Sequence, residues 1–183
     1  MDDALPLPDR CIVLVGLMGA GKSTVGRRLA RRLSLPFIDS DEEIEKAADR
    51  SISEIFDSFG EAGFRDGERR VIARLIGGHP KVIATGGGAF MDAETRALIL
   101  NRCTAIWLDA DIPTLTERVS RRDHRPLLHG KDAAVVLEGL ADTRRPFYSE
   151  AHIHIRSEAV AHERAVDMIV AALAKWRKER DAG

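Results

Sequence analysis

One short segment constrains the fold of this chain more than any other. Residues 16–24 read Gly-Leu-Met-Gly-Ala-Gly-Lys-Ser-Thr and fit the phosphate-binding loop pattern Gly-x-x-x-x-Gly-Lys-[Ser/Thr]. Residues 11–15, just before the loop, form an apolar run typical of a strand buried on both faces. After the loop, apolar residues recur at helical spacing, at Val25, Leu29 and Leu33. A strand, a glycine loop and a helix in this order predict a binding site for a nucleoside triphosphate.

Each part of this loop has an expected task. Backbone N–H groups wrap the phosphates, and the helix N-terminus adds partial positive charge. Lys22 reaches the terminal phosphates, and the Ser23 hydroxyl is a ligand for Mg²⁺. A glycine-rich turn that merely contains a lysine is the alternative, which the flanking strand and helix disfavour. The residues that we expect to contact the nucleotide here are Gly19, Ala20, Gly21, Lys22, Ser23 and Thr24.

Length and composition indicate one neutral domain. The chain has 183 residues and a net charge of −1, which gives no electrostatic reason to expect nucleic acid or a membrane as a partner. We expect a single domain over residues 10–178, with a flexible N-terminal tail at 1–9 and a short C-terminal tail at 179–183, where the last helix frays. Two cysteines, Cys11 and Cys103, are too few for a disulfide framework and fit a reducing cytoplasm. No signal peptide or membrane span is visible in the sequence.

Strand-like and helical segments alternate along the chain. Strands are predicted at 11–15, 36–39, 82–85, 104–108 and 152–155. Helices are predicted at 22–33, 41–48, 53–58, 61–76, 92–101, 111–121, 133–149 and 160–178. This alternation predicts an α/β fold with three layers, in which helices flank a parallel five-stranded sheet. The carboxyl ends of the predicted strands carry Gly16, Asp39, Gly86 and Asp109, so we expect one cleft there.

An acidic pair follows the second predicted strand. Asp39 and Asp41 stand two residues apart, beside the expected phosphate site. Asp41 alone is also a plausible helix cap. Two carboxylates next to a phosphate loop favour a functional interpretation, in which one holds the metal through water and the other meets a substrate hydroxyl.

Cations and glycines supply the next candidates. Arg65 and Glu68 share one helix face, and either they form an ordinary surface ion pair or Arg65 is a fork that grips a substrate carboxylate. Residues 86–88 are three glycines at a strand end, which suit either a flexible turn or a backbone that a ligand approaches closely. Arg144 is either a second carboxylate anchor or a surface cation. The basic stretch at 121–130 is either a solvated loop or a mobile lid, over about 120–132, that brings Arg125 to the transferring phosphate.

Together these motifs resemble shikimate kinase over about residues 11–175. The matching elements follow one another in the order of that family. They are Gly16-Leu-Met-Gly-Ala-Gly-Lys-Ser-Thr24, Asp39-Ser-Asp41, Phe64-Arg65 with Glu68, Gly86-Gly-Gly88, Arg125-Pro-Leu-Leu128 and Arg144-x-Pro-x-Tyr148. A phosphate-binding loop alone is shared with many families, whereas this combination is far more specific.

The resemblance implies phosphorylation of the 3-hydroxyl of shikimate by ATP, in aromatic amino-acid biosynthesis. It also implies a sheet like that of adenylate kinase, with a mobile lid. Asp39 would then lie in the second shell of the Mg²⁺ ion, and Asp41 would bind the ring hydroxyls and accept a proton or orient the attacking group. The carboxylate would be gripped by Arg65, Arg144 and the Gly87 N–H. Arg118 would lie beside adenine and Arg125 would close on the phosphates.

Two other functions stay open at this point. A kinase for another anionic polyol, such as gluconate, would share the architecture, and a non-catalytic nucleotide-binding regulator would share the loop. An Asn-Lys-x-Asp guanine motif is absent from the sequence, which disfavours a switch GTPase. Residues 157–161 also lack the arginine and proline with which some family members contact adenine. We expect a monomer.

Overall fold

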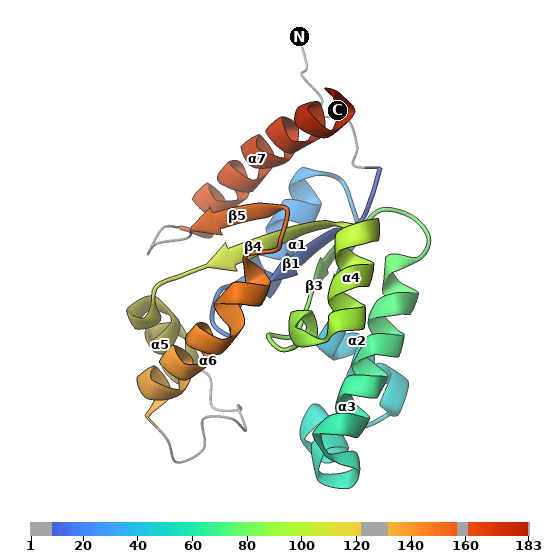
Figure 1. Ribbon diagram of the computed structural model, residues 1–183, viewed down its shortest axis with the longest axis vertical. Coiled ribbons are helices and arrows are strands. Elements are labelled where there is room, and N and C mark those ends of the chain that lie inside the picture. The colour runs from blue at the N-terminus through green and yellow to red at the C-terminus, as the bar shows by residue number, and fades with distance from the viewer. Residues whose placement is uncertain (1–8, 122–131, 157–160, 183) are drawn as a thin grey trace.

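A parallel sheet forms the centre of the molecule, as predicted. The computed structural model describes residues 9–121, 132–156 and 161–182. Within them, five strands pair in the order β2-β3-β1-β4-β5 (Figure 1). Every strand begins and ends within one residue of its predicted range. The strands are β1 (Ile12–Val15), β2 (Phe37–Asp39), β3 (Val82–Ala84), β4 (Thr104–Asp109) and β5 (Ile153–Arg156).

Helices connect the strands. They are α1 (Lys22–Arg32), α2 (Ser40–Ala48), α3 (Ile52–Ile76), α4 (Ala93–Arg102), α5 (Ile112–Ser120), α6 (Ala133–Tyr148) and α7 (His162–Ala182), with a short 3₁₀ helix, η1 (Ala89–Met91). The two predicted helices at 53–58 and 61–76 are the two arms of α3. Gly60 separates them with φ 66° and ψ −175°, a conformation that breaks the helix and that glycine adopts without strain.

The C-terminal end of the chain differs from its prediction. The last helix, predicted to end at residue 178 and to fray after it, continues as α7 to Ala182. Arg180 on this last turn donates hydrogen bonds to both carboxylate oxygens of Asp9, at 3.3 and 3.1 Å. This ion pair joins the end of α7 to the segment just before β1, which gives the last helical turn a long-range partner. Residues 1–8 and 183 of the predicted tails lie outside the described residues.

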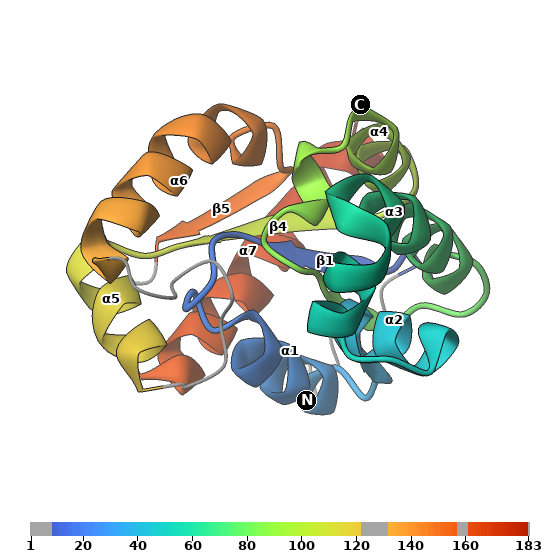
Figure 2. The same cartoon turned by 90° about the horizontal axis from the view of Figure 1, so that it is seen from below.

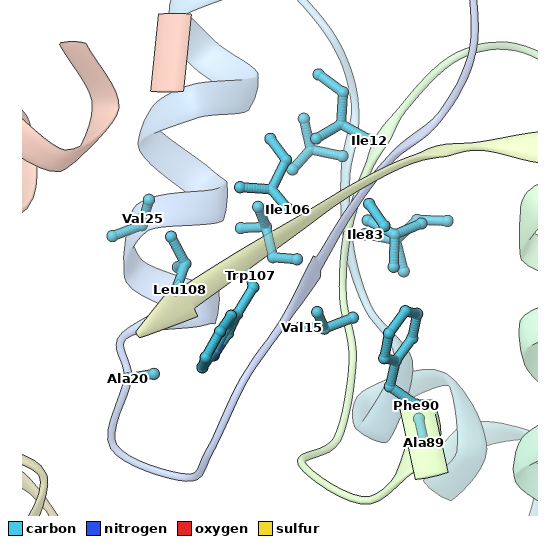
Figure 3. Packing of buried hydrophobic residues seen from close by; sticks show 14 of the residues in the cluster. Ile12, Val15, Ala20, Val25, Ile83, Ala89, Phe90, Ile106, Trp107 and Leu108 are labelled. Carbon is cyan, nitrogen blue, oxygen red and sulfur yellow. The ribbon is translucent and has the colours of Figure 1, made fainter. Parts of the chain in front are cut away.

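Helices cover both faces of the sheet (Figure 2). Helices α1 and α7 lie on one face, and α4 and α6 lie on the other. Side chains along the strands alternate between these two layers. Leu14 of β1 faces α1, where a Cβ added at Gly26 would lie 3.2 Å from its Cδ1. Trp107 of β4 (Figure 3) faces the opposite layer, where its ring centroid lies 5.9 Å from that of Tyr148 on α6. No described helix is long and apolar enough to cross a membrane.

Strand register brings the functional loops together. Ala84 of β3 pairs with Leu14 of β1 on one side and with Asp39 of β2 on the other. The Thr85 hydroxyl donates to the Leu14 carbonyl at 3.0 Å, which holds the chain after β3 beside the end of β1. The loops that follow β1, β2 and β3 therefore leave the same edge of the sheet as neighbours.

A neutral histidine just before β5 binds the backbone of β4, the strand that pairs with β5. His152, just before β5, accepts a hydrogen bond at Nδ1 from the Ala105 N–H of β4, at 3.0 Å. Its ring packs on Trp176 of α7, with centroids 5.0 Å apart. Burial lowers the pKa of His152, the Arg10 charge lowers it further, and a hydrogen bond to the Leu100 carbonyl opposes both. Protonation at Nδ1 would break the bond to Ala105.

This arrangement predicts a pH dependence of stability. Because the pKa of His152 is lower in the folded state, the unfolded state takes up a proton first as the pH falls below about 6.5. The free energy of unfolding should fall over that range, by at most about 1.4 kcal/mol per pH unit for this group. Denaturant unfolding at several pH values measures the slope, which His152→Gln should reduce. His154→Gln is the control; an unchanged slope in His152→Gln would contradict the assignment.

Candidate active site

The loop after β1 is built to receive an anion. Gly16, Gly19 and Gly21 have φ values of 142°, 83° and 89°, which let the chain fold back over the start of α1. Gly21 is the N-cap of α1 and provides no side chain to its first turn, which also holds no acidic residue. The N–H groups of this turn therefore suit an external anion. By contrast, side chains cap α2 to α6, namely Asp39, Ser51, Asp92, Asp111 and Asp132.

Lys22 bridges the loop from the first position of α1. Its Nζ donates to the carbonyls of Gly16 at 2.8 Å and Leu17 at 2.9 Å. The ammonium group is thus held over the loop, where it can reach the phosphates of a bound nucleotide. Ala20 differs from its neighbours, because its side chain is buried in the core (Figure 3) and only its backbone is left to the loop.

A cavity of about 390 Å³ opens beside this loop. The loop lines one wall with Gly19, Gly21 and Lys22 to Thr24. Asp39, Asp41 and the segment from Thr85 to Gly87 line a second wall. The remaining lining residues are Met18 and the half-buried or exposed basic side chains Arg118, Arg121 and His162. Of the four strand-end residues that we expected at one cleft, Asp39 and Gly86 line this cavity, whereas Gly16 and Asp109 do not.

Ser23 and Asp39 meet at the edge of the cavity. The Ser23 hydroxyl donates to Asp39 Oδ2 at 2.6 Å, while Asp39 Oδ1 accepts from the Asp41 N–H at 3.0 Å. Asp39 is therefore the cap of α2, and Asp41, the alternative cap, lies in the first helical turn. A hydroxyl and a carboxylate are oxygen ligands of the kind that Mg²⁺ prefers. The described residues contain no cluster of three acidic, histidine or cysteine side chains that could hold a metal alone.

The three glycines after β3 allow charged side chains to approach the backbone. A Cβ at Gly86 would lie 2.8 Å from Asp41 Oδ1, and one at Gly87 would lie 3.1 Å from Arg144 Nη1. A Cβ at Gly88 would overlap the Arg65 guanidinium. Close approach, rather than a merely flexible turn, thus explains the triple glycine. Asp41, Arg65 and Arg144, which are far apart in the sequence, converge on this one loop.

Arg65 is held by a buried acid, Glu68. Its Nη1 donates to Glu68 Oε2 at 2.7 Å, and the Glu68 side chain is 3% exposed. Burial raises the pKa of Glu68, Arg65 opposes this effect, and nearby Asp41 adds to it. Glu68 Oε1 is buried, makes no hydrogen bond within the protein, and lies 3.3 Å from a Cβ placed at Gly86. The pair is therefore part of the site and not an ordinary surface ion pair.

Basic side chains surround the other end of the cavity. Arg118 Nη1 donates to the Gly19 carbonyl at 3.3 Å. The His162 ring lies over Gly21, with Cδ2 and Nε2 both 3.4 Å from the position of a Cβ there. Burial lowers the pKa of His162, as do the charges of Arg118 and Arg28. His162 and Arg121 were not among the predicted site residues, because only the packing of α7 and α5 against the loop places them there.

Most of the predicted site residues meet in this one region. The loop residues other than Ala20 border the cavity, as do Asp39, Asp41 and Arg118. Arg65 and Arg144 approach the glycine loop beside it, which contains Gly87. Arg125 and residues 122–131 of the predicted lid lie outside the described residues. The arrangement combines a loop suited to phosphates, an acid suited to hydroxyl groups and two guanidinium groups suited to a carboxylate.

Comparisons with known proteins agree with this chemistry. The shikimate kinase family model matches residues 18–174. A shikimate kinase of Caulobacter vibrioides is 58% identical over 172 residues, which cover 94% of this chain and 86% of that protein. One of Zymomonas mobilis is 58% identical over 168 residues, covering 92% of this chain and 95% of that protein.

Solved structures give the same result. A shikimate kinase from Acinetobacter baumannii in complex with shikimate matches with a TM-score of 0.87 and 36% identity, covering 91% of this chain and 93% of that one. One from Bacteroides thetaiotaomicron matches with a TM-score of 0.83 and 31% identity, covering 90% and 98% of the two chains. A gluconokinase from Sinorhizobium meliloti, 18% identical with a TM-score of 0.59, shares the fold alone. The chain is a kinase that belongs to the shikimate kinase family.

Proposed function

We propose that the cavity and the adjacent glycine loop bind ATP and shikimate side by side, for transfer of the γ-phosphoryl group to the 3-hydroxyl of shikimate. The observation that carries this proposal is the convergence of Asp41, Arg65 and Arg144 on Gly86 to Gly88. A small anionic polyol needs cations for its carboxylate and an acid for its hydroxyls. Both are present next to a loop suited to phosphates.

The nucleotide end neutralises and aligns the phosphates. The open N-terminus of α1 and the Lys22 ammonium attract the phosphate oxygens. Ser23 and Asp39 fit Mg²⁺, which Ser23 would hold directly and Asp39 would hold through water. When bound, Mg²⁺ neutralises charge on the transferring group. Arg118 and His162 would border the base and ribose of the nucleotide.

The acceptor end orients shikimate. Arg65 and Arg144 supply planar donors for its carboxylate, together with the Gly87 N–H. Glu68 holds the Arg65 guanidinium in place and so fixes one side of this grip. Because phosphoryl transfer needs mainly alignment and charge neutralisation, the first task of Asp41 is to orient the attacking hydroxyl, and it accepts the proton late in the step.

The remaining expectations belong to the same proposal. Arg125 would meet the transferring phosphate, on a lid that excludes water and so limits hydrolysis of ATP. We propose a cytoplasmic monomer, with ATP and shikimate as its small-molecule partners. Gluconate is the alternative acceptor, and it would be gripped by the same two arginines.

An acceptor assay tests the function directly. With purified protein and Mg-ATP, we expect strong ADP release with shikimate, and only background release with gluconate or without an acceptor. Lys22→Ala should abolish the signal. Stimulation by gluconate instead would move the substrate assignment, and no stimulation by either acceptor would leave a nucleotide-binding regulator.

The role of Arg65 predicts a selective loss of affinity. Arg65→Ala removes one of two charged donors to the carboxylate, so the KM for shikimate should rise at least about 30-fold, corresponding to about 2 kcal/mol. The KM for ATP should change little. Steady-state kinetics with each substrate varied separates the two effects. Arg70→Ala is the matched control, since this arginine of α3 is 76% exposed; equal increases in both KM values would refute the role.

The close approach at Gly88 gives a steric test. Gly88 has φ −94° and ψ −11°, which alanine adopts without strain, so Gly88→Ala acts only through overlap with the Arg65 guanidinium. The Arg65 guanidinium is the end of a flexible side chain and should shift away from the added Cβ. We therefore expect the KM for shikimate to rise about tenfold and the melting temperature to stay nearly unchanged. Gly139→Ala is the control, because nothing lies within 4 Å of its added Cβ. A shikimate KM equal to that of the control would show that Arg65 is not held against Gly88.

A further inference from the structure

The three carbonyl groups of the glycine loop each have a hydrogen-bond donor. The Gly86 carbonyl accepts from the Ala89 N–H at 3.2 Å, and the Gly88 carbonyl accepts from the Met91 N–H at 3.0 Å. Both of these bonds are local and close the turns that lead into η1. The Gly87 carbonyl instead accepts from the Tyr148 hydroxyl, which comes from the last position of α6, 61 residues away.

Tyr148 is fixed in place by its surroundings. It is 1% exposed, and its ring lies between Phe90 and Trp107, with centroids 6.4 and 5.9 Å away. Burial raises the pKa of Tyr148 to about 12, despite the nearby Arg144 charge, so the phenol keeps its proton at neutral pH. The hydroxyl is therefore a permanent donor, and a rigid ring aims it at Gly87.

Tyr148 and Arg144 approach the same residue from one face of α6. They stand four positions apart, one helical turn, so their side chains are neighbours. Arg144 Nη1 lies 3.1 Å from the position of a Cβ at Gly87, whose carbonyl Tyr148 binds. The rest of this face is anchored in the core by Leu137 and Ala141. One helix face thus presents both a cation and a neutral donor to Gly87.

We propose that Tyr148 is a positioning residue for the substrate carboxylate. By binding the Gly87 carbonyl, its hydroxyl turns the negative end of this peptide toward α6 and keeps it away from the anion. The carboxylate then meets N–H groups and the Arg144 guanidinium rather than a carbonyl oxygen. This inference rests on the proposed carboxylate site at Arg65, Gly87 and Arg144.

Tyr148→Phe tests the proposal, because it removes the hydroxyl and keeps the ring. The freed Gly87 carbonyl is no longer oriented, so the KM for shikimate should rise about tenfold, while the KM for ATP and kcat stay within about twofold. The control is Leu137→Val, which loosens the buried face of the same helix without touching the loop. It should lower the melting temperature and leave the KM for shikimate unchanged.

The outcomes separate positioning from stability. A rise in the shikimate KM of less than threefold in Tyr148→Phe overturns the proposal, and so does an equal rise in Leu137→Val. Because KM does not depend on the concentration of active enzyme, a variant that is only partly folded still gives the answer. If the parent enzyme itself shows no shikimate-dependent ADP release, the proposed function fails instead.

Discussion

Charged side chains can converge on one loop only where the backbone carries no side chains of its own, and this constraint governs the acceptor site. Each of the three glycines after β3 admits a different charged group, from α2, α6 and α3 in turn. The parallel register of β1, β2 and β3 then sets that loop beside the phosphate loop. A single Cβ at any of these positions would meet Asp41, Arg144 or Arg65, so the geometry of the acceptor site follows from the fold of the sheet edge.

The helices and strands could be predicted from the sequence because residues that are neighbours in the chain determine where each one begins and ends. Short apolar runs give the strands, and Gly60 breaks α3 where the periodicity is interrupted. The end of α7 could not be predicted in this way. A chain end is expected to fray unless something holds it, and the ion pair of Arg180 with Asp9 joins residues 171 positions apart. Long-range partners of this kind leave no periodic signal in the sequence.

The residues of the candidate site also divide into those that a local pattern marks and those that only long-range packing places. Loop residues and strand-end acids were predictable because a motif or a strand end marks them. The burial of Glu68 was not, because its spacing from Arg65 also suits an exposed pair, and only the packing of α3 buries it. Adjacent arginines on α6 differ only in the direction they face. The Arg144 guanidinium approaches Gly87, whereas Nη2 of Arg145 lies 3.9 Å from Oδ1 of Asp109 on β4.

Net charge says little about such a site, because what matters is how each cation is held. On the outer side of α1, Arg27, Arg28 and Arg32 pair with carboxylates of α2 and α7. These ion pairs offset the positive charge of the three arginines, which could otherwise suggest a nucleic-acid surface. Lys22 and Arg118, in contrast, are held by loop carbonyls. A carbonyl dipole orients a cation without cancelling its charge. Backbone acceptors can therefore position cations beside the phosphate site in a chain whose net charge is −1.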